Sequence, residues 1–186
     1  LREKMKVVWE PEVAYRELDG LLADDQVEAV IIGVADQFHV SLAMKVIEAG
    51  KHVMVEKPLG VSVEECEALR ETVNHSSLVL QVGCNRRFDP GIVFARQFVD
   101  EEIGQRMGFK AWYYDSTHRY TMTDNLQPVI RQSVAARRPE GNPKVDRRRY
   151  CLLGHASHLV DTCRVLGGEF VRVRARLLER FNAYCW

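Results

Sequence analysis

Residues 27–58 read VEAVIIGVADQFHVSLAMKVIEAGKHVMVEKP, and this stretch decides the fold class. It opens on an apolar run rich in Val and Ile at 27–34, and a second short run follows at 53–55. Such runs are too short for helices and are typical of strands that are buried on both faces. Residues 38–49 between them carry apolar residues at helical spacing, and Gly50 supplies a stop. The stretch therefore predicts one strand–helix–strand unit.

A second unit follows directly. The Ser62 hydroxyl can cap a backbone N–H while Glu65 reaches back to the start of the same helix, which is a capping box. The apolar run at 78–82 then supplies a third strand. Consecutive crossovers of this kind give a parallel sheet, so we expect part of a doubly wound α/β domain. Upstream, residues 13–22 have the spacing of one more helix.

The pattern changes after Arg87, where we place a domain boundary between residues 1–87 and 88–186. The second part predicts helices at 90–99 and 150–166, strands at 107–114 and 170–178, and a long polar segment at 115–149. An irregular segment of that length is uncommon in a compact domain, so we expect it to be functional or mobile.

Composition excludes several classes of protein. Hydrophobic residues make up 46% and charged residues 28% of the 186 residues, which is typical of a folded globular chain. Twenty-six basic residues balance 26 acidic ones, so no field of the whole molecule attracts nucleic acid or a membrane surface. The charged N-terminus leads into no long apolar segment, and we expect no signal peptide, no membrane span and a cytoplasmic location.

The five cysteines form no C-x-x-C pair, so we expect reduced thiols that fill core space. The chain starts at Leu1 and stops at Trp186 inside an expected strand. We therefore expect the sequence to be a piece of a longer protein.

Polar and reactive side chains follow each predicted parallel strand, at 34–39, 56–58 and 83–87. The carboxyl ends of parallel strands meet at one edge of the sheet, where ligands bind in open α/β folds. Pro58 restricts Lys57 to an extended conformation and so fixes where its ammonium group points. The alternative for 56–58 is an ordinary charged surface turn.

A second candidate cluster lies in the predicted helix 150–166. His155 and His158 are three residues apart, and Asp161 follows one turn later, so all three share a helix face. The open interpretations are a neutral histidine acting as a general base, a histidine used for packing, and a metal ligand. Only two histidines and one carboxylate are local, and we expect no metal site.

Residues 131–149 hold seven basic and two acidic residues, a local net charge of +5. They fit a clamp for an anionic substrate, a nucleic-acid patch or a solvated loop. Aromatic residues and a recognition motif are both missing from the cluster, so we favour the loop and expect no nucleic-acid partner.

The ordered combination of A-G-K-H-V at 49–53, E-K-P at 56–58 and G-C-N-R-R-F at 83–88, followed by His158 and Asp161, resembles the Gfo/Idh/MocA oxidoreductases. The resemblance implies the C-terminal part of a Rossmann-type parallel sheet, then the start of an α/β substrate domain with an open antiparallel sheet. It also implies hydride exchange between NAD or NADP and a carbohydrate or polyol, in an enzyme that forms homo-oligomers when complete.

The resemblance also implies roles for individual residues. Lys57 and His158 would be catalytic, and Arg86, His155 and Asp161 would contact the substrate. The cofactor pocket would be formed by Val34, Asp36, His39, Glu56, Lys57 and Asn85. Oxidation of an alcohol removes a proton and a hydride together, so we assign the proton to His158 and stabilisation of the developing alkoxide to Lys57.

The sequence departs from the family pattern at three places. Gly154 stands where relatives commonly have Asp, Ala35-Asp36 replaces Pro-Asn, and the G-x-G-x-x-G turn is not found in the 186 residues. Two alternatives therefore remain open: an NAD-dependent glycosidase on the same fold, and a non-enzymatic binding or regulatory remnant of it.

Overall fold

A computed structural model describes residues 10–113, 146, 152–176, 178–180 and 183–185. The chain divides into two compact units, residues 1–82 and 83–186, each described here by itself. The expected boundary near Arg87 lies close to this division.

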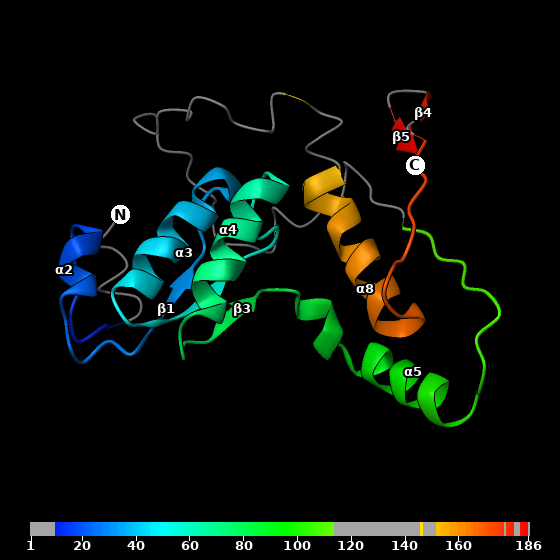
Figure 1. Ribbon diagram of the computed structural model, residues 1–186, viewed down its shortest axis with the longest axis horizontal. Helices are drawn as coiled ribbons and strands as arrows, with labels where there is room; N and C mark the ends of the chain where they lie inside the picture. Colours follow the sequence, from blue (N-terminus) through cyan, green and yellow to red (C-terminus); the bar gives the residue numbers. More distant parts are fainter. Residues whose placement is uncertain (1–9, 114–145, 147–151, 177, 181–182, 186) are drawn as a thin grey trace. The chain divides into compact units, whose positions relative to one another are not determined.

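The first unit is built on a three-stranded parallel sheet with the order β1-β2-β3 (Figure 1). The strands are β1 (Ala29–Ile32), β2 (His52–Val55) and β3 (Leu80–Val82). They confirm the strands predicted from the apolar runs at 27–34, 53–55 and 78–82. The register pairs Val30 with Val53 and Ile32 with Val55. Because side chains alternate along a strand, these four residues point to the same face.

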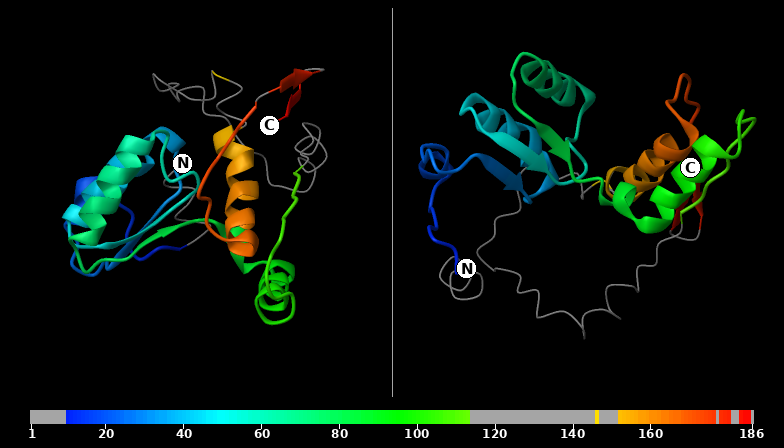
Figure 2. Two further views of the ribbon diagram at one scale, coloured as in Figure 1. Left: turned by 45° about the vertical axis from the view of Figure 1, so that its right-hand side comes forward. Right: turned by 90° about the horizontal axis from the view of Figure 1, so that it is seen from below.

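Both crossover helices cover that face. A short 3-10 helix, η1 (Asp36–Phe38), leads into α3 (His39–Glu48), and α4 (Val63–Asn74) follows β2. The two α-helices contact each other, and Figures 1 and 2 show them side by side over the strands. Each buried aliphatic side chain contributes about 1.5–3 kcal/mol. The core consists of Ile32, Val40, Ala43, Val46, Ile47, Val53, Val55 and Leu69.

The opposite face of the sheet is open in the described residues, with Ile31 76% exposed. Upstream of the sheet, α2 (Leu18–Leu22) is shorter than the predicted helix at 13–22. No side chain caps its first turn, which begins after Glu17.

The turn at 49–53 has a structural explanation. Gly50 adopts a positive φ of 75°, which closes α3, and Lys51 is only 6% exposed. Its ammonium group donates hydrogen bonds of 2.8 Å to each of the Asp24 and Val27 carbonyls. The buried charge thus ties this turn to the segment that enters β1.

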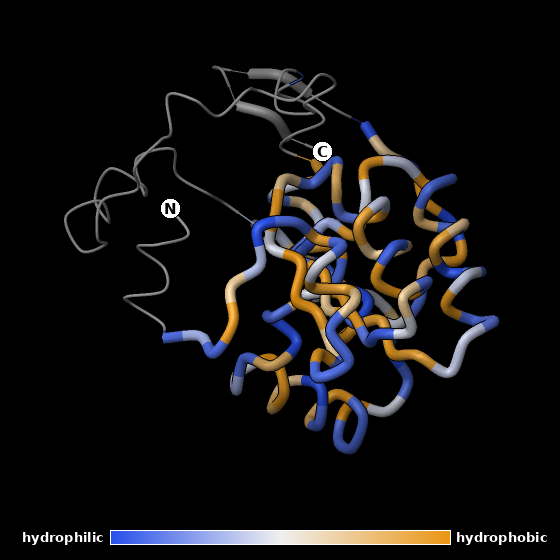
Figure 3. The backbone as a smooth tube through the Cα atoms, turned by 90° about the vertical axis from the view of Figure 1, so that its left-hand side faces the viewer, coloured by the Kyte–Doolittle hydropathy of each residue, from blue (hydrophilic) through white to orange (hydrophobic). Residues whose placement is uncertain are grey.

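The described part of the second unit is mainly helical. The 3-10 helix η2 (Asn85–Phe88) precedes α5 (Pro90–Glu101), whose Asp89 cap accepts a hydrogen bond from the Gly91 N–H at 2.9 Å. A π-helix, η4 (Leu152–Ala156), runs into α8 (Ser157–Gly167). The strands β4 (Leu178–Arg180) and β5 (Ala183–Cys185) pair antiparallel. Figure 3 shows hydrophobic and hydrophilic residues interspersed along the described chain.

The strand predicted at 107–114 is wrong over its described residues, and the strand predicted at 170–178 is found only at Leu178, where β4 begins. Residues 107–113 and 170–176 carry no strand pairing, and Met107 is 98% exposed. A strand needs a partner for its backbone N–H and C=O groups, and a run of apolar residues does not supply one. The helix predicted at 150–166 is confirmed from Leu152, although its first turn is a π-helix.

The segment 115–149, with its basic cluster, lies outside the described residues except for the exposed Asp146. Cys66, Cys84 and Cys163 are half-buried and free, and Cys151 and Cys185 lie outside the described side chains. Among the helices of the described residues, none has the length and apolar character to span a bilayer.

Candidate functional site

The loop after β1 carries three predicted cofactor residues. Val34 is 49% exposed, and Asp36 opens the short helix η1. His39 begins α3 and is 1% exposed. Its Nδ1 lies 2.7 Å from the Pro58 carbonyl oxygen and its Nε2 lies 3.1 Å from the Val34 carbonyl oxygen. Each ring nitrogen therefore lies within hydrogen-bonding distance of a backbone carbonyl oxygen, and the ring is buried in the protein interior.

The loop after β2 carries Glu56 and Lys57. The Glu56 side chain is exposed, and its Oε2 accepts a hydrogen bond of 3.1 Å from the Lys57 N–H. Lys57 is half-buried, and the bond that joins it to Pro58 is cis. The Glu56 N–H donates to the Ile32 carbonyl at 3.0 Å, so this loop begins beside the end of β1.

The far end of the same loop is held by α4. The Glu65 carboxylate accepts hydrogen bonds from the Val61 N–H and, at 2.9 Å, from the Ser62 N–H. The Ser62 hydroxyl accepts from the Glu65 N–H at 3.2 Å, which confirms the predicted capping box. Gly60 is buried against this cap, and a Cβ there would lie 2.7 Å from the Glu65 Oε1.

Five of the predicted residues thus come together in the first unit. Because β1 and β2 are adjacent and parallel, their carboxyl ends bring two polar loops to one edge of the sheet. These loops hold Val34, Asp36, His39, Glu56 and Lys57. The arrangement offers a lysine ammonium group and a carboxylate at the edge where open α/β sheets bind ligands.

The other predicted residues lie in the second unit. Asn85 and Arg86 belong to η2, and Asn85 is exposed. The neighbouring Arg87 joins η2 to α8 through Asp161, which is 9% exposed. The Arg87 Nε donates to both carboxylate oxygens, at 3.0 and 2.8 Å, and Nη2 donates to Oδ1. Asp161 was predicted to contact substrate, but in the structure its carboxylate forms a bidentate ion pair with Arg87.

This ion pair sets the electrostatics of η2. Hydrogen bonding to Asp161 raises the pKa of the Arg87 guanidinium, in opposition to its partial burial. Burial, followed by the nearby Asp161 carboxylate, raises the pKa of the Cys84 thiol, and Arg87 acts in the opposite direction. Cys84 is thus held as a neutral thiol beside the ion pair.

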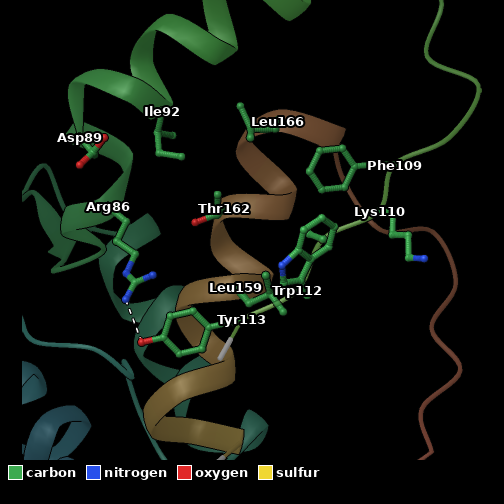
Figure 4. A pocket seen from close by; sticks show the side chains of 11 residues that line it. Arg86, Asp89, Ile92, Phe109, Lys110, Trp112, Tyr113, Leu159, Thr162 and Leu166 are labelled. Carbon is green, nitrogen blue, oxygen red and sulfur yellow. Dashed lines mark hydrogen bonds between the residues drawn. The ribbon is translucent and has the colours of Figure 1, made fainter. Parts of the chain in front are cut away.

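Arg86, the neighbour of Arg87, contacts an aromatic side chain. Its Nη2 donates to the Tyr113 hydroxyl at 3.0 Å, and the guanidinium carbon lies 4.7 Å from the centroid of the Tyr113 ring (Figure 4). Both residues line a cavity of about 520 Å³. The remaining walls come from Asp89, Ile92, Phe109, Lys110, Ala111, Trp112, Leu159, Thr162 and Leu166.

His155 and His158 stand on either side of a change in helix type. His155 lies in the π-helix and His158 in the first turn of α8, and both are half-buried. The His158 carbonyl accepts a hydrogen bond of 2.8 Å from the Thr162 hydroxyl. A π-helical turn is wider than an α-helical one and is frequent at functional sites. The wider turn therefore changes the angular spacing of His155 and His158 around the helix axis from that of a regular α-helix.

The first loop keeps a donor that suits a polar ligand. The Gln37 Nε2 in η1 is buried and has no hydrogen-bond partner among the described residues. A buried donor of this kind is costly unless a ligand or water satisfies it. The residues after β1 therefore fit a polar cofactor group. Within the described residues, His, Cys, Asp and Glu form no group of three or more that could hold a metal ion.

Sequence reasoning missed Arg87, Tyr113 and Gly60. Arg87 and Asp161 are separated by 74 positions, and Arg86 and Tyr113 by 27, so no local pattern links either pair. Gly60 could have been noticed because it stands just before the capping box, where chain and helix approach closely.

Comparisons with known proteins place these loops in a known context. Residues 2–84 match the GFO_IDH_MocA model, described as an oxidoreductase family with an NAD-binding Rossmann fold. The scyllo-inositol 2-dehydrogenase (NAD(+)) of Bacillus subtilis is 38% identical over 96 residues, which cover 51% of this chain and 28% of that protein. Levoglucosan dehydrogenase of Pseudarthrobacter phenanthrenivorans is 28% identical over 162 residues, covering 85% of this chain and 37% of that protein.

A solved structure of levoglucosan dehydrogenase, in complex with NADH and levoglucosan, shares the fold. The aligned region covers 91% of this chain and 42% of the levoglucosan dehydrogenase chain, with a TM-score of 0.66 and 24% sequence identity. The chain thus spans only 28% and 37% of the lengths of the two curated relatives. Residues 2–84 belong to the Gfo/Idh/MocA family of oxidoreductases, and these relatives and the parallel sheet agree with that assignment.

Proposed function

We propose that this chain forms the catalytic part of a dehydrogenase that uses NAD or NADP to oxidise a secondary alcohol of a sugar, inositol or related polyol. The single observation that supports this most is the edge formed by the loops after β1 and β2, within the stretch that matches an NAD-binding model. That edge carries an ammonium group, a carboxylate and an unused amide donor.

The cofactor would be held at this edge by Val34, Asp36 and Glu56, with Lys57 beside it. Asn85, in η2 of the second unit, remains a predicted cofactor contact. The exposed Val34 offers a flat apolar surface, and the buried amide of Gln37 offers a hydrogen bond. A bound nicotinamide supplies the hydride acceptor that protein side chains lack.

Lys57 stabilises the negative charge that develops on the substrate oxygen. A fixed cation is effective there because it needs no reorganisation as the charge appears. The Lys57 backbone is suited to this role, since the residues that follow it are held by α4. This role depends on a water-poor site.

His158 takes the hydroxyl proton, with His155 one helical turn away as the alternative base. Arg86, His155 and Asp161 were predicted to contact substrate. Arg86 lies at a cavity where an aromatic ring already holds its guanidinium, and Asp161 acts by orienting η2 through Arg87. We propose that the substrate meets Arg86 and the two histidines.

The test is a substrate panel of inositols, hexoses and nucleotide sugars, offered with NAD+ and with NADP+ to the full-length product of the gene. The expected result is formation of reduced nicotinamide with at least one polyol. Hydrolysis of a glycoside without net cofactor reduction would identify a glycosidase instead. Absence of both cofactor binding and turnover would favour a non-enzymatic binding protein.

A further inference from the structure

His39 is a buried titratable group that the proposed reaction does not use. Its side chain is 1% exposed, and it is among the largest fully buried side chains of the described residues. Its two nitrogens lie 2.7 Å from the Pro58 oxygen and 3.1 Å from the Val34 oxygen. A ring enclosed in this way cannot also face a bound cofactor.

The chemistry of these contacts makes the ring a bridge between two loops. A carbonyl oxygen only accepts hydrogen bonds, and a neutral imidazole has one N–H to donate. A neutral His39 therefore makes one true hydrogen bond, and a doubly protonated ring makes both. In either form the buried ring fixes the spacing of the two loops, because its removal leaves a carbonyl without a donor.

The bridge meets the chain immediately beside Lys57. Pro58 follows Lys57 directly, and its carbonyl is the one closer to the ring. On the other side, Lys57 is joined to Glu56, whose N–H is bonded to the end of β1. The position of the Lys57 backbone is thus limited by β1 before it and by α3 after it.

The next residues are held by the second crossover helix. Gly60 is buried, and a Cβ there would lie 2.8 Å from the Val40 Cγ2 on α3 and 2.7 Å from the Cys66 Sγ on α4. Glu65 accepts hydrogen bonds from the N–H groups of Val61 and Ser62. The first turns of α3 and α4 therefore hold the Lys57 loop (residues 57–62) together.

We propose that His39 is a positioning residue, which holds the Lys57 loop so that the ammonium group stays where the reaction needs it. The proposal rests on the proposed function for the role of Lys57. It replaces direct cofactor contact as the function of His39. A displacement of about 1 Å at a reacting group can lower turnover by about a hundredfold, so a buried bridge of this kind can control rate without touching substrate.

Three variants of the full-length protein separate positioning from general destabilisation. His39→Phe keeps a ring and removes both ring nitrogens. His39→Asn places an amide nitrogen near the position of Nδ1 and keeps a donor for the Pro58 carbonyl. Val46→Ala, on the same helix and fully buried, removes core packing and keeps both carbonyl contacts of the His39 ring. Circular dichroism and thermal melting establish that each variant folds.

The first readout is hydrogen–deuterium exchange of peptides that cover residues 57–62. We expect His39→Phe to raise exchange there by about tenfold or more, and Val46→Ala to leave this segment at the wild-type level relative to the rest of the first unit. If His39→Phe leaves the segment unchanged, the bridge does not hold the loop and the proposal is wrong. If this variant does not fold, His39→Gln is compared with Val46→Ala in the same way, because its amide nitrogen lies near the position of Nε2 and leaves the Pro58 carbonyl without a donor.

The second readout is steady-state kinetics. We expect His39→Phe to lower kcat by about ten- to a hundredfold with little change in KM for the nicotinamide, and His39→Asn to recover most of the loss. An equal loss of kcat in Val46→Ala would overturn the positioning role. If wild-type enzyme turns over no substrate, the proposed function fails, and exchange of residues 57–62 then decides on the bridge alone.

Discussion

His158 and His155 compete for one role, and the pH dependence of turnover distinguishes them. A general base acts only while it is unprotonated, so its removal abolishes the limb of the kcat/KM profile that it controls. We expect His158→Ala to lower kcat strongly and to remove the limb near neutral pH. The matched variant His155→Ala should keep this limb. An unchanged profile in His158→Ala would transfer the role of base to His155.

Cys84 reports on the Arg87–Asp161 ion pair. The thiolate is the species that alkylating reagents attack, and burial and Asp161 raise the pKa of the Cys84 thiol. We expect native Cys84 to react with iodoacetamide more slowly at about pH 8 than an unperturbed thiol does. Asp161→Asn removes a carboxylate that raises the pKa of the Cys84 thiol. It also frees the Arg87 guanidinium, which lowers that pKa. Peptide mapping should therefore show faster modification of Cys84.

Cys66 is the internal control, because burial raises the pKa of its thiol in the other unit. Its rate should stay the same in Asp161→Asn, and an unchanged rate at Cys84 would contradict the account. The sign for stability follows from the same shift. A thiol whose pKa is raised in the folded state contributes fully to the free energy of unfolding below about pH 8.5, the pKa of an unperturbed thiol. The contribution is lost as the pH rises through the higher pKa of the folded state.

Single residues were predictable from the sequence where their partners are local. The Ser62 and Glu65 cap is contained in four consecutive positions and was found, since helix capping depends on nearby backbone groups. The sequence also marked His39 and Asp161 as polar residues in the right segments. Their true partners, Pro58 and Arg87, are distant in sequence, so only the folded chain reveals what these side chains do.

Gly60 limits how closely α4 and the Lys57 loop can approach. A Cβ at Gly60 would lie 2.7–2.8 Å from atoms of Val40, Glu65 and Cys66, and the Glu65 oxygen cannot move without losing its bonds to the loop. Overpacking of this kind costs about 1–3 kcal/mol. We expect Gly60→Ala to lower the melting temperature and to reduce kcat.

Gly33→Ala is the matched control for that prediction. No atom lies within 4 Å of a Cβ built at Gly33, so its effect on the free energy of unfolding should stay within about 0.5 kcal/mol. Equal melting temperatures for the two variants would show that the space around Gly60 can relax.

Elements whose stability is local were predicted better than strands of the second unit. The crossover helices α3 and α4 and the helix α5 carry a complete apolar stripe or cap in their own sequence. The predicted strands at 107–114 and 170–178 depend on partners elsewhere, and residues 107–113 and 170–176 are unpaired. The π-helix before α8 also had no sequence signal, because a regular helix has the same apolar pattern.

For the whole molecule, the candidate residues are shared between two units. The first unit supplies Lys57 and the edge of the parallel sheet, and the second supplies the histidines and η2. The sequence predicted both groups through an ordered set of motifs, and the family model matches residues 2–84 of that set. The proposed reaction requires the two groups to act on one substrate.

The most direct measurement is transfer of deuterium from a labelled substrate. A polyol active in the panel is prepared with deuterium on its carbinol carbon, and the nicotinamide product is analysed by mass spectrometry in wild type and Lys57→Ala. The account predicts deuterium in the reduced nicotinamide, formed about a hundredfold more slowly in Lys57→Ala. Consumption of substrate without label in the nicotinamide, or equal rates in the two proteins, would contradict it.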